Sequence, residues 1–141
     1  MPLEEESRKR AFYRVAWNVH HLWKEKGSSD TRLFLPPIIS DKHVIAGRSL
    51  NGGNYKEHVV PRLMICEECH RRFASGHTVE EVAEFIEKFL KIVLITKQEQ
   101  RYLDGKDQLN LKQTMPPGWS WEDGDVFARL NYAEIKFSSM V

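Results

Sequence analysis

The sequence predicts an α+β fold, with a long N-terminal helix, a small irregular β region and several short helices around one core. Two observations favour this class. Apolar residues recur at helical spacing over residues 12–23 and again in three later segments. Residues 31–53 lose that spacing and carry prolines and glycines, which favours short extended segments and loops.

The composition is that of an ordinary globular protein. The chain has 141 residues, of which 41% are hydrophobic and 29% charged, and its 21 basic and 20 acidic residues leave a net charge of +1. A chain of this length is expected to form a single domain over residues 1–141. A net charge this close to zero gives no sign of a strongly basic segment that would bind a polyanion. A nucleic-acid contact would therefore need a local basic patch.

Membrane and secretory features are not expected. The longest apolar run, residues 92–95, is far too short to span a bilayer, and the charged N-terminal segment lacks the apolar core of a secretory signal. Two cysteines are too few to form the set of disulfide bonds that stabilises a disulfide-rich secreted protein of this size. We therefore expect a cytoplasmic protein with reduced thiols and no membrane partner.

The N-terminal helix is the clearest element, and Gly27 is expected to end it. Its apolar residues form one face of a helix of about five turns. The residues of this face are Phe12, Val15, Ala16, Val19, Leu22 and Trp23. Tyr13, Trp17 and His20 lie on a flank beside it and fit either the core or a partner surface. After the helix, the sequence Asn51-Gly52-Gly53-Asn54 predicts a turn with extended chain on both sides.

A helix over residues 62–74 is predicted next, because Pro61 suits a first helical turn and the apolar residues after it have helical spacing. Cys66, Cys69 and Phe73 share one face of this helix. Both cysteines are therefore expected to be buried, and their spacing disfavours a relaxed disulfide between them.

The remaining elements are marked mainly by capping signals. Thr78 with Glu81 and Thr96 with Glu99 form two capping boxes, each of which begins a helix. The apolar run between them reads as a buried strand, and a last group of apolar residues near the C-terminus suggests one more helix. The predicted elements are residues 79–90, 92–95, 97–104 and 126–135.

Residues 54–77 carry most of the reactive side chains, including three of the six histidines and both cysteines. Here the chain resembles HNH, or His-Me finger, endonucleases. Glu57-His58-Val59-Val60-Pro61 is similar to the acidic residue, histidine, hydrophobic residues and proline of that family. Cys66-Glu67-Glu68-Cys69-His70 looks like the later C-x-x-C that is followed directly by a histidine.

The resemblance implies a small HNH-like protein that processes or binds nucleic acid. His58 would be the general base, since the pKa of an imidazole lies near neutrality. Glu57 and His70 would be ligands of a divalent metal, Mg or Mn. Three nearby arginines would hold phosphates as bidentate donors. They are Arg62, Arg71 and Arg72.

The cysteines leave two further interpretations open. Cys66 and Cys69 fit small core residues on one helix face. With His58 or His70 they would instead form a structural zinc site.

A second function class is a non-catalytic interaction protein, such as an inhibitor or accessory factor of the kind that phages and mobile elements encode. Trp119 and Trp121 follow a double proline and would anchor a protein partner, or else cover the edge of the core. The acidic residues that follow them repel phosphate, which favours a protein contact at this loop. On this view, Glu57-His58 is a surface pair and Arg71-Arg72 a solvated face.

Overall fold

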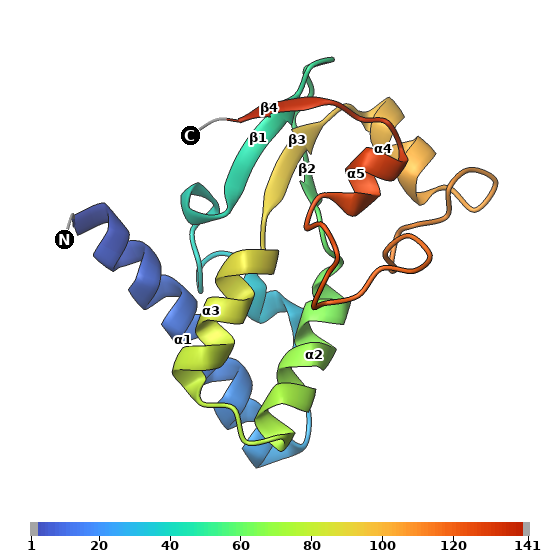
Figure 1. The fold of residues 1–141 in the computed structure, drawn as a ribbon. Helices are drawn as coiled ribbons and strands as arrows, with labels where there is room; N and C mark the ends of the chain where they lie inside the picture. The colour runs from blue at the N-terminus through green and yellow to red at the C-terminus, as the bar shows by residue number, and fades with distance from the viewer. Residues whose placement is uncertain (1–2, 140–141) are drawn as a thin grey trace. The chain divides into compact units, whose positions relative to one another are not determined.

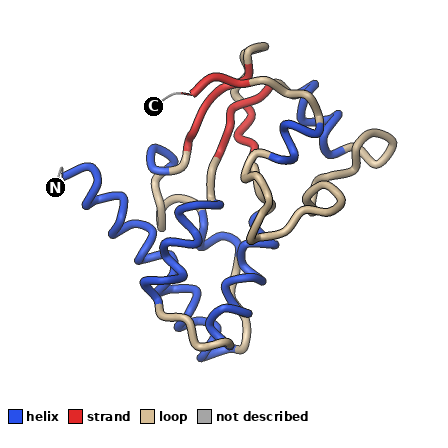
Figure 2. Tube along the Cα trace, viewed as in Figure 1, coloured by secondary structure: helices blue, strands red, loops and turns tan. Residues whose placement is uncertain are grey.

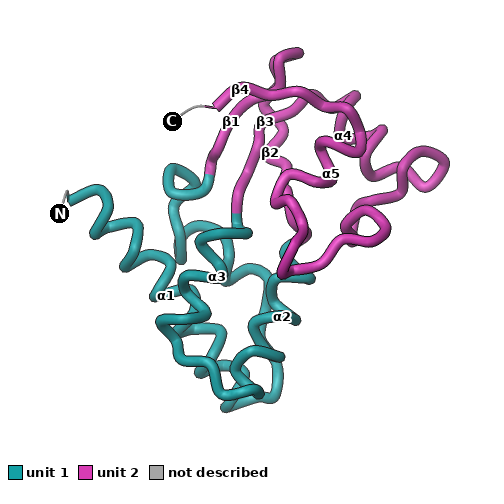
Figure 3. Tube along the Cα trace, viewed as in Figure 1, with its two compact units in different colours: residues 1–44, 62–90 teal, residues 45–61, 91–141 magenta. Residues whose placement is uncertain are grey.

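The computed structural model describes residues 3–139 and has the α+β class predicted from the sequence. Contacts within the chain divide it into two compact units (Figure 3). The first unit consists of residues 1–44 and 62–90, and the second of residues 45–61 and 91–141. Each unit is thus built from two separate stretches of the sequence. The single domain expected over residues 1–141 stays a prediction.

The first unit is helical (Figures 1 and 2). The elements are α1 (Leu3–Lys26), η1 (Thr31–Phe34), η2 (Asp41–His43), α2 (Arg62–Ala74) and α3 (Val79–Phe89). Helix α1 packs against both α2 and α3 and buries Phe12, Val15 and Val19 completely or nearly so. It begins well before the predicted apolar face, and Gly27 ends it as expected, with a φ of 76°.

Helix α2 has the bounds that the sequence predicts, and its apolar face confirms the interpretation of the cysteines as buried thiols. Cys66 and Cys69 are both free and both buried, and Phe73 is buried beside them. Burial raises the pKa of both thiols, which keeps them protonated at neutral pH.

Both predicted capping boxes are present. The Glu81 N–H donates to Thr78 Oγ1 over 3.1 Å, and the Thr78 N–H donates to Glu81 Oε1 over 2.9 Å. The same reciprocal pair joins Thr96 and Glu99 at the start of α4 (Lys97–Asp104). Each box satisfies two backbone donors that the helix itself leaves without partners.

Removing the first cap should have a small, measurable cost. Thr78→Ala is expected to lower the free energy of unfolding by about 1 kcal/mol, because one helical N–H loses its acceptor. Urea unfolding followed by circular dichroism measures the change. Thr114→Ala, at an exposed threonine in a loop, is the matched control and should lie within about 0.5 kcal/mol of the wild type. Equal losses for both variants would contradict the role given to the cap.

The second unit contains a mixed four-stranded sheet (Figure 2). Its strands are β1 (Ile45–Ser49), β2 (Tyr55–His58), β3 (Ile92–Ile95) and β4 (Phe137–Ser139), in the order β2-β3-β1-β4. β3 is parallel to β1 and antiparallel to β2, and β4 is antiparallel to β1. The predicted strand at residues 92–95 is confirmed, with all four residues buried. This was the only strand that the sequence indicated clearly; β1, β2 and β4 complete the sheet.

The turn at residues 51–54 lies between β1 and β2, with extended chain on both sides as expected. These strands do not pair with each other, because β3 lies between them. Gly53 has a φ of 99°, and a Cβ there would lie 2.3 Å from the backbone of Ile95. Glycine is therefore required for the close approach of this turn to β3.

The prediction of a last helix over residues 126–135 was wrong in its extent. Helix α5 covers only Ala128–Tyr132. Glu134 has a φ of 58°, which turns the chain away from the helical path, and buried Ile135 follows the turn and leads into β4. The apolar residues of this segment thus lie in a helix, in the turns beside it and in the chain that leads to β4. Their helical spacing therefore predicted too long a helix. Across residues 3–139, no helix is both long and apolar enough to cross a membrane.

Candidate functional site

The Glu57-His58-Val59 segment lies at the end of β2 in the second unit. Glu57 pairs with Val93 and His58 with Ile92 of β3, and the Val59 N–H donates to the Lys91 carbonyl over 2.9 Å. Alternation along the strand puts the Glu57 side chain on a buried face, whereas His58 is half-buried.

Arg129 of α5 holds this segment from within the second unit. Its side chain is 1% exposed. Nη2 donates to Glu57 Oε1 over 2.8 Å, Nη1 donates to the His58 carbonyl over 2.7 Å, and Nε donates to the Leu111 carbonyl over 2.8 Å. Nη1 also lies 3.5 Å from the Val59 carbonyl. One guanidinium therefore holds the Glu57 side chain and the backbone carbonyls of His58 and Val59.

Two carboxylates share the charge of Arg129. Nη2 contacts Asp104 Oδ1 at 3.4 Å as well as Glu57. The pKa of Glu57 is raised to about 7, chiefly by burial and also by the Asp104 charge, while the charge and hydrogen bond of Arg129 act in the opposite direction. A buried charge network of this kind contributes geometry as well as energy.

A metal ion does not fit between these carboxylates while Arg129 holds them. Both contact the same guanidinium nitrogen, so Arg129 supplies the positive charge that a metal bound by both would supply. In the part of the chain that the structure describes, no group of three or more His, Cys, Asp or Glu side chains could hold a metal ion. The metal-binding roles of Glu57 and His70 stay predictions, and no chemical step is assigned to a metal.

The buried carboxyl group of Glu57 should make stability depend on pH. Its pKa is about 7 in the folded chain against 4.5 for the free group, so the folded state binds more protons within that range. The free energy of unfolding should therefore fall as pH rises from about 4.5 to 7, by up to about 3 kcal/mol. Urea unfolding of wild type and Glu57→Gln across this range measures the difference. Parallel curves for the two proteins would contradict the raised pKa.

His70 of α2 faces Ser29, in the loop after α1 of the first unit. The Ser29 hydroxyl lies 2.5 Å from His70 Nε2 and 3.3 Å from Cys66 Sγ. The Trp23 ring stacks on the imidazole with 6.2 Å between centroids. Burial lowers the pKa of His70, which favours the neutral ring. The contact with Ser29 depends on tertiary packing and could not be predicted from the sequence.

Two arginines near the end of α2 already have an acidic partner. Arg71 Nε donates to Glu68 Oε1 over 2.7 Å, and Arg72 Nε donates to Glu68 Oε2 over 3.0 Å. The Arg72 guanidinium also lies 4.1 Å from the centroid of the Phe85 ring. A phosphate would have to compete with Glu68 for both side chains. Arg62 is half-buried at the start of the helix. The phosphate-binding roles of these three arginines stay predictions.

The two tryptophans of the loop before α5 pack edge to face, with 4.9 Å between their ring centroids. Trp119 Nε1 donates to the Asp125 carbonyl over 2.8 Å. A Cβ at Gly124 would lie 2.2 Å from the same nitrogen, so the glycine makes room for the indole. Trp119 thus organises its own loop, and its role with Trp121 as a partner contact stays a prediction.

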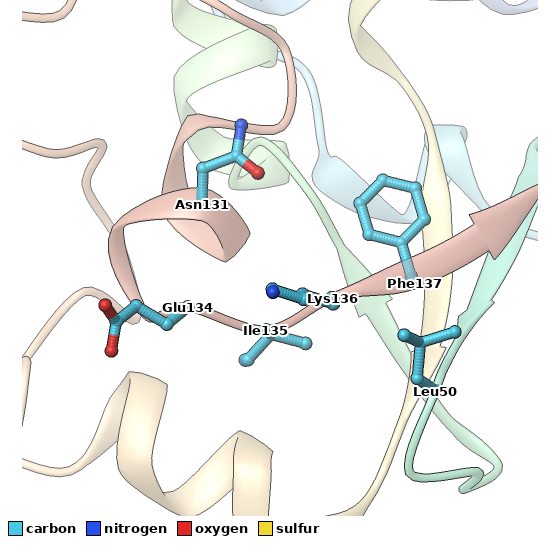
Figure 4. A pocket seen from close by; sticks show the side chains of 6 residues that line it. All are labelled: Leu50, Asn131, Glu134, Ile135, Lys136 and Phe137. Atoms are coloured by element: carbon cyan, nitrogen blue, oxygen red, sulfur yellow. The ribbon is translucent and has the colours of Figure 1, made fainter.

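A hollow of about 740 Å³ opens beside β4 in the second unit (Figure 4). Asn131, Glu134 and Lys136 contribute polar groups to it, and Leu50, Ile135 and Phe137 contribute apolar ones. Its lining contains neither a histidine nor a cysteine, and Leu50 is 66% exposed at its edge. This mixed lining suits a peptide or protein segment better than a reacting group.

Comparison with known proteins does not place the chain in a family: no protein family, curated protein or solved structure matches it.

Proposed function

We propose that this chain is a small HNH-like protein that binds and processes nucleic acid, with His58 as its general base. The observation that supports the proposal is the hold of Arg129 on the segment that carries His58. Burying a guanidinium costs free energy. Here the buried group donates hydrogen bonds to the Glu57 carboxylate and to the His58 carbonyl. Such supporting contacts are what a precisely positioned side chain needs.

The chemistry follows from the imidazole. In hydrolysis of a phosphodiester, His58 accepts a proton from water as the water oxygen forms a bond to phosphorus. The bond from phosphorus to the leaving oxygen breaks, and that oxygen takes a proton from solvent or from the imidazolium. Arg129 is buried and therefore acts as a positioning residue, because it holds the backbone rather than the substrate.

The test is a cleavage assay on two substrates. Supercoiled plasmid and a labelled single-stranded oligonucleotide are incubated with the purified chain in Mg²⁺, in Mn²⁺ and in EDTA. Cleavage of either substrate would support the proposal, and the EDTA sample shows whether a metal is needed. Absence of cleavage would overturn the catalytic role of His58, and absence of binding at low salt as well would overturn the whole proposal.

A second candidate is the non-catalytic interaction protein, and one observation favours it. Leu50 is 66% exposed beside the hollow of Figure 4, and Tyr132 in the same unit is 54% exposed. Large exposed apolar side chains at a mixed hollow are typical of protein contacts. This function would replace the first if the chain neither cleaves nor binds nucleic acid.

A further inference from the structure

One face of α1 carries cations and aromatic rings. Arg10, Tyr13, Trp17, His21 and Lys24 are spaced by three, four, four and three residues, which places them on one side of a helix. We call these five residues the α1 stripe. It lies opposite the face that packs into the first unit, and Tyr13 and Trp17 are 41% and 45% exposed. The sequence left open whether the flank of Tyr13, Trp17 and His20 was core or a partner surface. Tyr13 and Trp17 are exposed, whereas His20 is half-buried and packs on Phe73.

The Trp17 ring is held in place by a series of aromatic contacts. Its centroid lies 4.1 Å from that of His21, which meets His20 at 5.2 Å. His20 in turn packs on Phe73 of α2 at 4.4 Å. These contacts lie within the first unit and connect the exposed indole to its buried core. A ring fixed in this way loses little conformational entropy when a second flat ring stacks on it.

The charges of the stripe suit an anionic strand. Arg10 and Lys24 lie near its two ends, 14 residues apart, which is about 21 Å along a helix. Arg10 is 4.0 Å from Glu6 in a solvent-exposed pair, which is worth little, so a phosphate can replace the carboxylate. The stripe holds no aliphatic side chain and ends in a lysine, a residue type in which the centre of a protein interface is poor, while its arginine and aromatic rings are suited to phosphates and bases as well as to proteins.

We propose that the α1 stripe is a stacking platform for single-stranded nucleic acid. Unpaired bases stack on Trp17 and Tyr13, and Arg10 and Lys24 bind the phosphates on either side. Single-strand binding commonly combines aromatic platforms with cationic tracks. A duplex keeps its base faces within the helix, so the platform selects unpaired strands. This inference rests on the proposed function and deepens it, because it names the substrate class.

The test is a titration of a fluorescently labelled 12-nucleotide oligo(dT) with the full chain, followed by anisotropy at low salt. Trp17→Ala should weaken binding by about 5- to 150-fold, the loss of one stacked base. Tyr102→Ala is the matched control, because Tyr102 is a 43% exposed aromatic on α4 of the second unit. Thermal melts of both variants establish that each one is folded. Wild-type affinity in folded Trp17→Ala, or no oligonucleotide binding by the wild type, would overturn the platform.

Salt dependence tests the phosphate contacts. The Arg10→Ala, Lys24→Ala variant should flatten the slope of log affinity against log salt by about 1.4, at about 0.7 per phosphate on a single strand. Lys106→Ala, Lys112→Ala, at exposed lysines of the second unit, should leave the slope unchanged. An unchanged slope in the first variant would overturn the phosphate contacts. Stronger binding of an oligoglutamate peptide than of oligo(dT) would assign the stripe to acidic proteins and overturn the proposal.

Different results would contradict the stacking platform and the catalytic role of His58. Trp17-dependent binding without cleavage by the wild type supports the platform and overturns only catalysis. Cleavage with binding that does not depend on Trp17 overturns only the platform.

Discussion

Replacing His58 by alanine is expected to lower the rate of nucleic-acid cleavage by about 10²- to 10⁴-fold, the usual contribution of a general base. The fold should persist, because the contacts of Arg129 with residue 58 use its backbone carbonyl, which alanine retains. Initial rates of plasmid nicking give the first quantity, and the midpoint of thermal unfolding gives the second.

His77→Ala is the matched control for this experiment. His77 is exposed in the turn before α3, and its Nδ1 lies 3.0 Å from the Arg72 carbonyl. Its removal should leave the rate within about twofold of the wild type, since a surface substitution away from the site has little effect. Equal rates for wild type and His58→Ala would end the assignment of His58 as the base, whatever the control shows.

Elements with local signals were predictable from the sequence. The two capping boxes fix the start of α3 and α4 through hydrogen bonds between residues three apart, so no tertiary information is needed. Gly27 ends α1 through its own backbone freedom, at a φ of 76°. The run at residues 92–95 is apolar throughout because β3 is flanked by two strands and buried on both faces.

The sheet order could not be read in the same way. β1 and β2 are joined by a short turn that suggests a hairpin, yet each pairs with β3, more than 30 residues further along the chain. β4 is a short edge strand whose Ser138 and Ser139 are exposed, so it shows no alternation of apolar and polar residues. Pairing over such separations is decided by tertiary packing, which leaves no periodic signal in the sequence.

Of the candidate site, only the Glu57-His58 motif could be predicted from the sequence. Glu57 and His58 were recognisable from their residue types and spacing, whereas Arg129 was not. In the sequence it is one arginine in a short amphipathic segment, of the kind that usually faces solvent. Its burial depends on carbonyl groups supplied by His58 and Leu111, residues far from it in the sequence.

Arg129→Met should be among the most destabilising substitutions in the second unit. We expect the free energy of unfolding to fall by about 3–5 kcal/mol, the usual cost of removing one partner of a buried ion pair. Methionine has a similar length, so a cavity contributes little. Glu57 would lose its closest cation and two backbone carbonyls would lose their donor. Urea unfolding followed by circular dichroism measures the loss.

Two further variants decide what the loss means. Arg101→Met, at an exposed arginine of α4, should change stability by less than about 0.5 kcal/mol and controls for the chemical change itself. The double variant Glu57→Leu, Arg129→Met should be more stable than Arg129→Met alone, because the more deeply buried of the two carboxyl groups that Arg129 contacts is then absent. If Arg129→Met matches the control in stability, the buried guanidinium does not hold the segment around His58. The structural support for His58 as a positioned base would then be lost as well.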